Sequence, residues 1–322
     1  MARPAAYPME LGEDAPPSSD DVTALPKWLE TRKRASLVLD DGTVFEGFSF
    51  GHPESTTGEV VFNTGMVGYP ESLTDPSYAG QILVITFPLV GNYGVPGDDI
   101  DEMGLSKFFE SSKIHVQAVV IADYSFEASH YQAKKTLGQW LRDHGVPAIY
   151  GVDTRMITKQ IRERGSMLGK VVVAGSKKAE EMAFVDPNAE NLSAKVSRTE
   201  PQVFLPAKRE PGTPDGWTKV ADDHGDGAAA AADAADTPRK DPPHILAIDC
   251  GVKNNIIRYL VTHLRVKVTV VPWDYDFTED EFDGLFLSNG PGDPTQLTKT
   301  IGHIRACMQK RPNTPIFGIC LG

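Results

Sequence analysis

The sequence predicts an α/β protein with two domains, a β-rich domain followed by a doubly wound parallel sheet. The length of 322 residues corresponds to two domains of about 150 residues each. The hydrophobic fraction is 40% and the charged fraction 24%, as in soluble globular proteins. Short strand patterns dominate before residue 174, whereas strand and helix patterns alternate after residue 243. This change of pattern predicts the order of the two domains.

The charge and the cysteine content exclude several classes of protein. The formal net charge is −12, so the chain does not offer the cations that neutralise a row of phosphates, and no nucleic-acid partner is expected. No apolar run reaches the roughly 18 residues of a transmembrane helix, so no membrane partner is expected. The three cysteines, Cys250, Cys307 and Cys320, lack metal-ligand spacing and suit a reducing compartment. We therefore expect a cytoplasmic protein without a metal site.

Two segments have the composition of disordered chain. Residues 1–35 are rich in proline and acidic residues, and they contain neither the apolar run of a secretory signal nor the Arg-rich helix of a transit peptide. Residues 206–243 consist mainly of Ala, Asp, Pro and Gly, and Val220 is their only branched aliphatic residue. Such a segment does not bury enough apolar surface to offset its ordering entropy. We expect a disordered acidic tail over 1–35 and a disordered linker over 206–243.

The first folded domain is predicted over residues 36–205. Two apolar runs around Asp40-Asp41-Gly42 predict a β-hairpin. Runs rich in β-branched and aromatic residues predict further strands, at 59–63, 82–87, 116–121 and 167–173. A helical period with Gly145 at its end predicts a helix within 127–144, and Asp153 predicts the start of a helix that ends at Gly165.

The second domain is predicted over residues 244–322. Apolar runs predict buried strands, and apolar residues at helical spacing predict two helices between them. The strands are expected at 245–248, 266–271, 285–288 and 316–319, and the helices at 254–264 and 298–308. This order is that of a doubly wound parallel sheet, in which ligands bind at the carboxyl ends of the strands. Because the chain stops directly after the last strand, we expect a partial domain, truncated after Gly322.

Two motifs follow neighbouring strands of this predicted sheet. The sequence GICLG at 318–322 has the pattern of a nucleophile elbow, in which two glycines allow a sharp turn that exposes the central side chain, here Cys320. The amide of the next residue, Leu321, is then placed to stabilise an oxyanion. A loop with Gly290, Pro291 and Gly292 follows the preceding strand. Taken alone, the thiol reads more often as a buried cysteine and the loop as a tight turn, but together they predict one substrate site.

Longer motifs resemble a known family. The sequences SNGPGDP at 288–294 and FGICLG at 317–322 are similar to those of class I glutamine amidotransferases. The sequences GEVVFNTGMVGYPE at 58–71, LTDPSY at 73–78, GNYG at 91–94 and GVDTR at 151–155 resemble the amino-terminal domain of the carbamoyl-phosphate synthetase small subunit. The resemblance runs from about Ser36 to Gly322 and is nearest to the pyrimidine-pathway form, in which the glutaminase is fused to the synthetase.

This resemblance implies an enzyme that hydrolyses glutamine through a cysteine thioester and supplies ammonia for carbamoyl phosphate synthesis, in pyrimidine or arginine biosynthesis. It assigns the nucleophile to Cys320, and the oxyanion and glutamine contacts to Gly290, Gly292, Leu321 and Ser77. From its local pattern alone, Ser77 is an ordinary turn hydroxyl. The implied partner is the ammonia-using synthetase portion, fused or separate, which would bind ATP and Mg²⁺, whereas no cofactor is expected in this chain.

One part of the family's site has no counterpart in the sequence. A thiol with an ordinary pKa near 8.5 needs an activating base, and the family supplies a His, oriented by a Glu, beyond the nucleophile. The eight histidines all precede Cys320 and none lies in a matching motif; His303 is expected to face solvent. The 322-residue chain alone is therefore expected to be inactive. The alternatives are a non-catalytic docking module for the synthetase, and another class I amidotransferase, against which the 58–71 motif argues.

Overall fold

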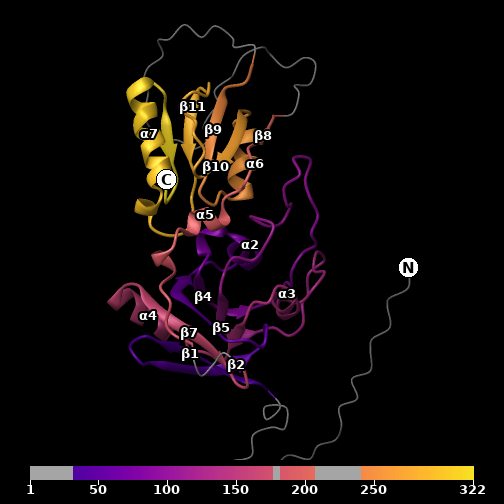
Figure 1. The fold of residues 1–322 in the computed structure, drawn as a ribbon. Coiled ribbons are helices and arrows are strands. Elements are labelled where there is room, and N and C mark those ends of the chain that lie inside the picture. Colours follow the sequence, from indigo (N-terminus) through magenta and orange to yellow (C-terminus); the bar gives the residue numbers. More distant parts are fainter. Residues whose placement is uncertain (1–31, 177–181, 207–240) are drawn as a thin grey trace, which may run out of the picture. The chain divides into compact units, whose positions relative to one another are not determined.

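A computed structural model describes residues 32–176, 182–206 and 241–322 (Figure 1). From Arg34 to Gly322 the chain forms one compact unit. The predicted acidic tail and most of the predicted linker, including His224, lie outside the described residues. No helix in the described ranges combines the length and the apolar character needed to span a membrane.

The first domain is a closed barrel of seven strands in the order β1-β2-β6-β5-β4-β3-β7. The strands are β1 (Arg34–Leu39), β2 (Val44–Ser49), β3 (Thr56–Asn63), β4 (Gln81–Val90), β5 (Ala118–Tyr124), β6 (Ala148–Tyr150) and β7 (Met167–Val173). The predicted hairpin is confirmed, because β1 and β2 pair antiparallel. Strands β3, β4, β5 and β6 are parallel neighbours. Their carboxyl ends therefore meet at one end of the barrel.

Alternate residues along the central strands β4 and β5 pack into two separate hydrophobic clusters. Leu83 and Ile85 of β4 belong to a cluster that includes Leu73 of α2 (Tyr69–Thr74) and Trp140 of α3 (Leu137–Asp143). The alternate residues Ile82 and Val84 join the cluster inside the barrel, to which every strand contributes. Helix α4 (Thr154–Arg164) adds Ile157 and Ile161 to this inner cluster. The strands β4 and β5 are thus buried on both faces, which is why they read as continuous apolar runs.

One predicted helix is much shorter than expected, and one is confirmed. Of the range 127–144, only α3 is helical, because Thr136 caps its first turn by accepting a hydrogen bond from Gln139 N. The residues before it are held instead by a bridge between Val95 and Lys135. Helix α4 begins after Asp153, whose side chain accepts from Met156 N at 2.9 Å, as the sequence predicts.

The second sheet has the order β12-β11-β9-β10-β8. Its strands are β8 (Gln202–Phe204), β9 (His244–Asp249), β10 (Lys267–Pro272), β11 (Gly284–Leu287) and β12 (Ile316–Gly318). The last four are parallel to one another, as predicted. Helix α6 (Asn254–Thr262) packs through Ile257 on one face, and α7 (Thr298–Lys310) packs through Cys307 on the other. Helices on both faces make the sheet doubly wound.

Strand β8 differs from the expected domain boundary. Its residues fall within 36–205, the range predicted for the first domain, yet Phe204 pairs with Val268 of β10 in antiparallel register. Residues 202–204 therefore belong to the second sheet. The sequence gives little sign of this, because a strand of three residues with two exposed side chains is defined by its partner and not by its own pattern.

Short helices lie in the loops of both domains. They are α5 (Leu192–Val196) and the 3₁₀ helices η1 (Pro76–Tyr78), η2 (Pro187–Ala189) and η3 (Pro294–Gln296). Each 3₁₀ helix follows an aspartate whose side chain accepts a hydrogen bond from a backbone N–H inside the turn. These Asp-Pro pairs fix the start of each turn, because the carboxylate satisfies a free N–H and the proline presets φ.

Candidate active site

The carboxyl ends of three parallel strands place the predicted motifs side by side. Strand β11 pairs with β9 through Leu287 and Ile248, and with β12 through Leu287 and Gly318. The turn after β9, the 288–292 loop after β11 and the turn at 319–322 therefore follow adjacent strands at one edge of the sheet. This is the edge at which doubly wound proteins bind their ligands.

The turn after β12 has the geometry of a nucleophile elbow. Cys320 has φ +56°, and Arg265 is the only other non-glycine residue with positive φ in the described ranges. A Cβ on Gly318 would lie 2.2 Å from Gly322 O, and one on Gly322 would lie 2.2 Å from Leu287 O. Both glycines are therefore required by close backbone approach. The strained backbone at Cys320 is the feature expected where a side chain is held out for reaction.

Cys320 is the accessible thiol of the chain. It is exposed, whereas Cys250 and Cys307 are buried. Burial, together with the charge of Asp249, raises the pKa of Cys250 to about 12, so that thiol stays protonated and unreactive. Leu321 packs its side chain against the core cluster that contains Leu285, so its backbone lies at the turn while its side chain anchors the elbow to the domain.

The 288–292 loop is packed tightly against the turn after β9. Ser288 is fully buried, and its hydroxyl accepts from Cys250 N at 2.9 Å and donates to Asn289 O at 2.7 Å. A Cβ on Gly290 would lie 2.1 Å from Cys250 O. Gly292 has φ +85°, a conformation that favours glycine. Both predicted glycines are thus required by the local backbone, which fixes the direction of their amides.

Asn289 joins this loop to the first domain. Its Nδ2 donates to Ser77 Oγ at 2.9 Å and to Gly251 O at 2.9 Å. The side chain is 3% exposed, and its Oδ1 is buried without a hydrogen-bond partner among the described residues. The structure therefore brings Ser77 to the residue next to Gly290, across more than 200 positions of sequence. Sequence reasoning singled out Ser77 and the glycines but missed Asn289, although it stands inside the motif.

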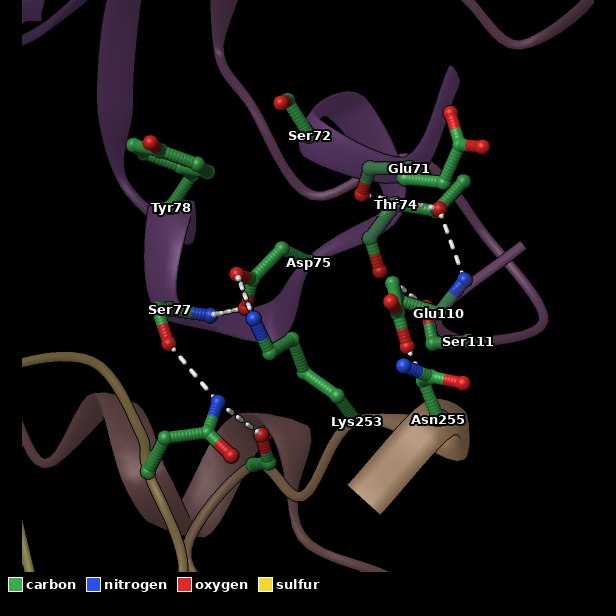
Figure 2. Close-up of polar contacts among 12 residues, drawn as sticks. Glu71, Ser72, Thr74, Asp75, Ser77, Tyr78, Glu110, Ser111, Lys253 and Asn255 are labelled. Atoms are coloured by element: carbon green, nitrogen blue, oxygen red, sulfur yellow. Dashed lines mark hydrogen bonds and ion pairs between the residues drawn. The ribbon is translucent and has the colours of Figure 1, made fainter. Parts of the chain in front are cut away.

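A short network holds Ser77 in place (Figure 2). The carboxylate of Asp75 accepts from Ser77 N at 2.9 Å, and its other oxygen lies 3.5 Å from Lys253 Nζ. Lys253 is the residue before the first turn of α6. Because Asp75 contacts both its own 3₁₀ turn and the second domain, the position of Ser77 depends on the seam between the two domains.

The same seam caps α6 from outside the helix. Asn254 N donates to Glu110 O at 2.8 Å. Asn255 N donates to the Glu110 carboxylate at 2.9 Å (Figure 2). The first N–H groups of a helix lack partners within it, so the barrel domain supplies them here. Glu110 N in turn donates to the Thr74 hydroxyl at 3.0 Å. Burial raises the pKa of Glu110 above its usual range.

A second clamp lies one turn further along α6. Arg258 donates through Nε and Nη2 to Asp101 Oδ2, at 3.1 and 3.0 Å, and through Nη2 to Ser106 O at 2.8 Å. A planar guanidinium that binds a carboxylate and a carbonyl at once fixes orientation as well as distance. No sequence pattern marks this pair, because its members are far apart in the chain.

The histidines in the described ranges contact groups other than the Cys320 thiol. His303, expected to face solvent, is half-buried, with Nδ1 3.2 Å from Asp276 Oδ1 and its ring near Phe277. None of the histidines in the described ranges hydrogen bonds to Cys320, and the activating base stays a prediction. Within these ranges there is also no group of three or more His, Cys, Asp or Glu side chains that could hold a metal ion.

Comparisons with known proteins agree with both halves of this architecture. Residues 37–171 match the family "Carbamoyl-phosphate synthase small chain, CPSase domain", and residues 246–322 match "Glutamine amidotransferase class-I". The chain is 46% identical over 329 residues to Multifunctional protein pyrABCN of Emericella nidulans, a match that covers 95% of this chain and 13% of that protein. It is 47% identical over 288 residues to Multifunctional protein CAD of Squalus acanthias, covering 89% and 11%.

A third relative has a different name. Carbamoyl-phosphate synthase [ammonia], mitochondrial, of Homo sapiens is 42% identical over 313 residues, covering 94% of this chain and 18% of that protein. The chain thus spans less than a fifth of the length of these three relatives. The expected family is confirmed for both domains. The chain belongs to the carbamoyl-phosphate synthase small-chain family, with a CPSase domain followed by a class I glutamine amidotransferase domain.

Proposed function

We propose that the chain is the glutamine-hydrolysing part of a carbamoyl-phosphate synthase. The observation that carries the proposal is the exposed thiol of Cys320 on a positive-φ elbow at the carboxyl edge of the sheet. The thiolate attacks the carboxamide carbon of glutamine and gives a tetrahedral intermediate. The proton that the thiol gave up passes to the leaving nitrogen, so that collapse of this intermediate releases ammonia and leaves a glutamyl thioester, which water hydrolyses to glutamate and free thiol.

The remaining site residues bind and stabilise. The amides of Leu321 and Gly290 are proposed to donate to the oxyanion, because the turn at 319–322 and the 288–292 loop follow adjacent strands at the same edge of the sheet. Gly292 and the Ser77 hydroxyl are proposed to hold glutamine. The hydrogen bond from Asn289 to Ser77 Oγ supports this role, because the oxygen accepts from Asn289 and its own proton is left to donate to a substrate.

The ammonia requires a consumer. We propose that this is an ammonia-using synthetase portion, fused or separate, and that it binds ATP and Mg²⁺. The printed names of the relatives, multifunctional proteins and carbamoyl-phosphate synthases, support such a partner and a place in pyrimidine or arginine biosynthesis. The reduced cysteines support a cytoplasmic location.

A second candidate is a docking module that does not hydrolyse glutamine. The printed name of one relative, carbamoyl-phosphate synthase [ammonia], names ammonia. A region similar to this chain therefore occurs in a protein that is not named for glutamine. The accessible cysteine at the elbow favours the glutaminase, because a docking role needs neither an exposed thiol nor a strained backbone at that position.

Replacement of the thiol separates the two candidates. In the protein that carries this chain together with its synthetase portion, Cys320→Ser should abolish glutamine-dependent synthesis and leave ammonia-dependent synthesis unchanged. The reason is that the thiol only liberates ammonia, while a serine hydroxyl is far less acidic and is not activated comparably. Cys307→Ser, a change at a buried cysteine of the same chain, is the matched control. Unchanged glutamine-dependent synthesis by Cys320→Ser would refute the proposal.

A further inference from the structure

The side chain of Asn289 is buried at the active-site loop, yet one of its polar atoms is unpaired. It is 3% exposed, and its Oδ1 has no hydrogen-bond partner in the described part of the chain. Both hydrogens of the amide are used, because Nδ2 donates to Ser77 Oγ and to Gly251 O, each at 2.9 Å. An unmet hydrogen bond on a buried oxygen destabilises a folded protein. Asn289 therefore does more than fill space, for which an apolar side chain would be better suited.

The neighbours of Asn289 determine which way its amide faces. Gly251 O can only accept a hydrogen bond, so the group that faces it must be the NH2 group and not the carbonyl oxygen. Gly251 has φ +127°, and a Cβ there would lie 3.1 Å from Pro76 Cβ and 3.2 Å from Gly290 Cα. The η1 turn and the 288–292 loop are thus both packed against Gly251, and the amide that joins them is held in one orientation.

This orientation sets the direction of the hydrogen bond at Ser77. An NH2 group only donates, so the Ser77 oxygen accepts and the hydroxyl proton must point elsewhere. The backbone of Ser77 is fixed, because Ser77 N donates to the Asp75 carboxylate at 2.9 Å. Ser77 is only half-buried, and none of the described residues accepts its hydroxyl proton. The hydroxyl is therefore a preorganised donor for a ligand.

Glutamine offers two kinds of acceptor to such a donor. They are the carboxamide oxygen and the α-carboxylate, whereas the α-ammonium group only donates. The carboxamide oxygen becomes the oxyanion, for which the amides of Leu321 and Gly290 are proposed. The α-carboxylate is left for Ser77, and a hydrogen bond to an ionised acceptor is stronger than one to a neutral acceptor.

We propose that Asn289 is a positioning residue that makes Ser77 a hydrogen-bond donor to the α-carboxylate of glutamine. The inference rests on the proposed function, which supplies glutamine as the substrate. Asn289 acts through Ser77 and does not touch the substrate. Without Asn289 the Ser77 hydroxyl rotates, and its oxygen accepts from water or from the α-ammonium group instead. Because the α-carboxylate is remote from the bond that breaks, the contact stabilises ground state and transition state alike, and its loss raises KM and leaves kcat unchanged.

A double-mutant cycle tests whether Asn289 acts through Ser77. Glutamine hydrolysis is measured in the protein that carries this chain together with its synthetase portion. Asn289→Ala and Ser77→Ala should each raise KM for glutamine by about tenfold or more, the effect of losing a charge-assisted hydrogen bond, with kcat within about twofold. In the double variant, KM should exceed that of Ser77→Ala by no more than about twofold, because the residue through which Asn289 acts is already gone.

Asn254 provides a matched control. Its Nδ2 donates to Phe109 O at 3.1 Å, so it also joins the second domain to the first, without contacting Ser77. Asn254→Ala should leave KM for glutamine unchanged. Effects of Asn289→Ala and Ser77→Ala that multiply in the double variant would overturn the proposal. A lower kcat of Asn289→Ala at unchanged KM would also overturn it, because that result assigns the side chain to the shape of the oxyanion loop.

Asn289→Asp separates the polarity of the side chain from its shape. Aspartate has nearly the same size, but an ionised carboxylate only accepts, and it would take the Ser77 proton that the proposal gives to the substrate. KM for glutamine should therefore rise at least as far as in Asn289→Ala. A KM closer to the wild-type value than that of Asn289→Ala would show that shape matters and the donor does not, and the proposal would be wrong.

Two competitors of glutamine identify the substrate group that Ser77 binds. Glutaramate keeps the carboxylate and lacks the α-amino group, whereas 4-aminobutanamide keeps the amino group and lacks the carboxylate. Asn289→Ala should raise the inhibition constant of glutaramate by about tenfold or more and that of 4-aminobutanamide by less than about twofold. An equal rise for both compounds, or the reverse pattern, would contradict the assignment to the α-carboxylate.

The two proposals fail in different ways. If the unmodified protein does not convert glutamine to glutamate, the proposed function is wrong. If it does, and Asn289→Ala has the wild-type KM, the function stands and the role of Asn289 is wrong.

Discussion

Replacement of Gly290 by alanine tests the geometry of the active-site loop most directly. The added Cβ would lie 2.1 Å from Cys250 O and 2.8 Å from the carbonyl carbon behind it. Ordinary contacts of carbon atoms are about 3.5–4.0 Å, so the two backbones must separate by more than about 1 Å. Both partners are main-chain atoms, and neither moves without disturbing the sheet edge.

We expect Gly290→Ala to lower both the stability of the chain and the rate of glutamine hydrolysis. Thermal unfolding of the chain should show a loss of about 1–3 kcal/mol, the usual cost of overpacking. Glutamine hydrolysis by the protein that carries this chain should fall by about 10²–10³-fold, the effect of losing one oxyanion donor. Gly302→Ala is the matched control, because a Cβ there meets nothing within 4 Å on the helix α7, and it should stabilise the chain slightly. If Gly290→Ala unfolds at the wild-type temperature and hydrolyses glutamine normally, the close approach is not essential.

Two further predictions concern a buried histidine of the first domain and the seam between the domains. Burial lowers the pKa of His115 to about 4, so the stability contributed by its neutral form is complete above pH 6.5 and is lost as pH falls from 6.5 to about 4. His115→Gln should therefore flatten the acid limb of a stability–pH curve by about 2–3 kcal/mol, and an unchanged acid limb would contradict the assigned burial. Arg258→Met should destabilise the chain by about 1–2 kcal/mol through lost charge-assisted hydrogen bonds to Asp101 and Ser106, whereas Lys159→Met, which breaks an exposed pair, should change stability by less than about 0.5 kcal/mol. Equal denaturant midpoints for the two variants would refute the importance of the clamp.

The second sheet could be predicted almost strand by strand because its signals are local. Strands β9, β10, β11 and β12 are apolar runs bounded by turns, and α6 and α7 carry apolar residues at helical spacing. Strands β9, β10 and β11 are largely buried, so their sequences alone record their burial. Strand β12 differs from the buried strand that its apolar run predicts, because all three of its residues are exposed. The elbow could be predicted from local signals as well, since both glycines and the cysteine are contiguous.

The parts that sequence reasoning missed depend on distant partners. The helix expected within 127–144 is replaced up to Thr136 by a bridge to Val95, which no periodicity within that segment reveals. The sequence pattern does not single out Asn289, because its importance is its hydrogen bond to Ser77, 212 positions away. No local pattern marks Glu110 and Arg258, because their contacts form only where α6 begins against the barrel. Ser77 itself was found through family resemblance, because its local pattern is only that of a turn.

The strand β8 changes how the chain can be divided. Both β8 and β9 pair with β10, so the chain leaves the second sheet at Phe204 and re-enters the same sheet at His244. Phe204 and His244, on either side of this stretch, therefore belong to one sheet. A protein begun at residue 244 would instead leave the hydrogen-bonding edge of β10 open, and the natural point of dissection lies upstream of residue 202.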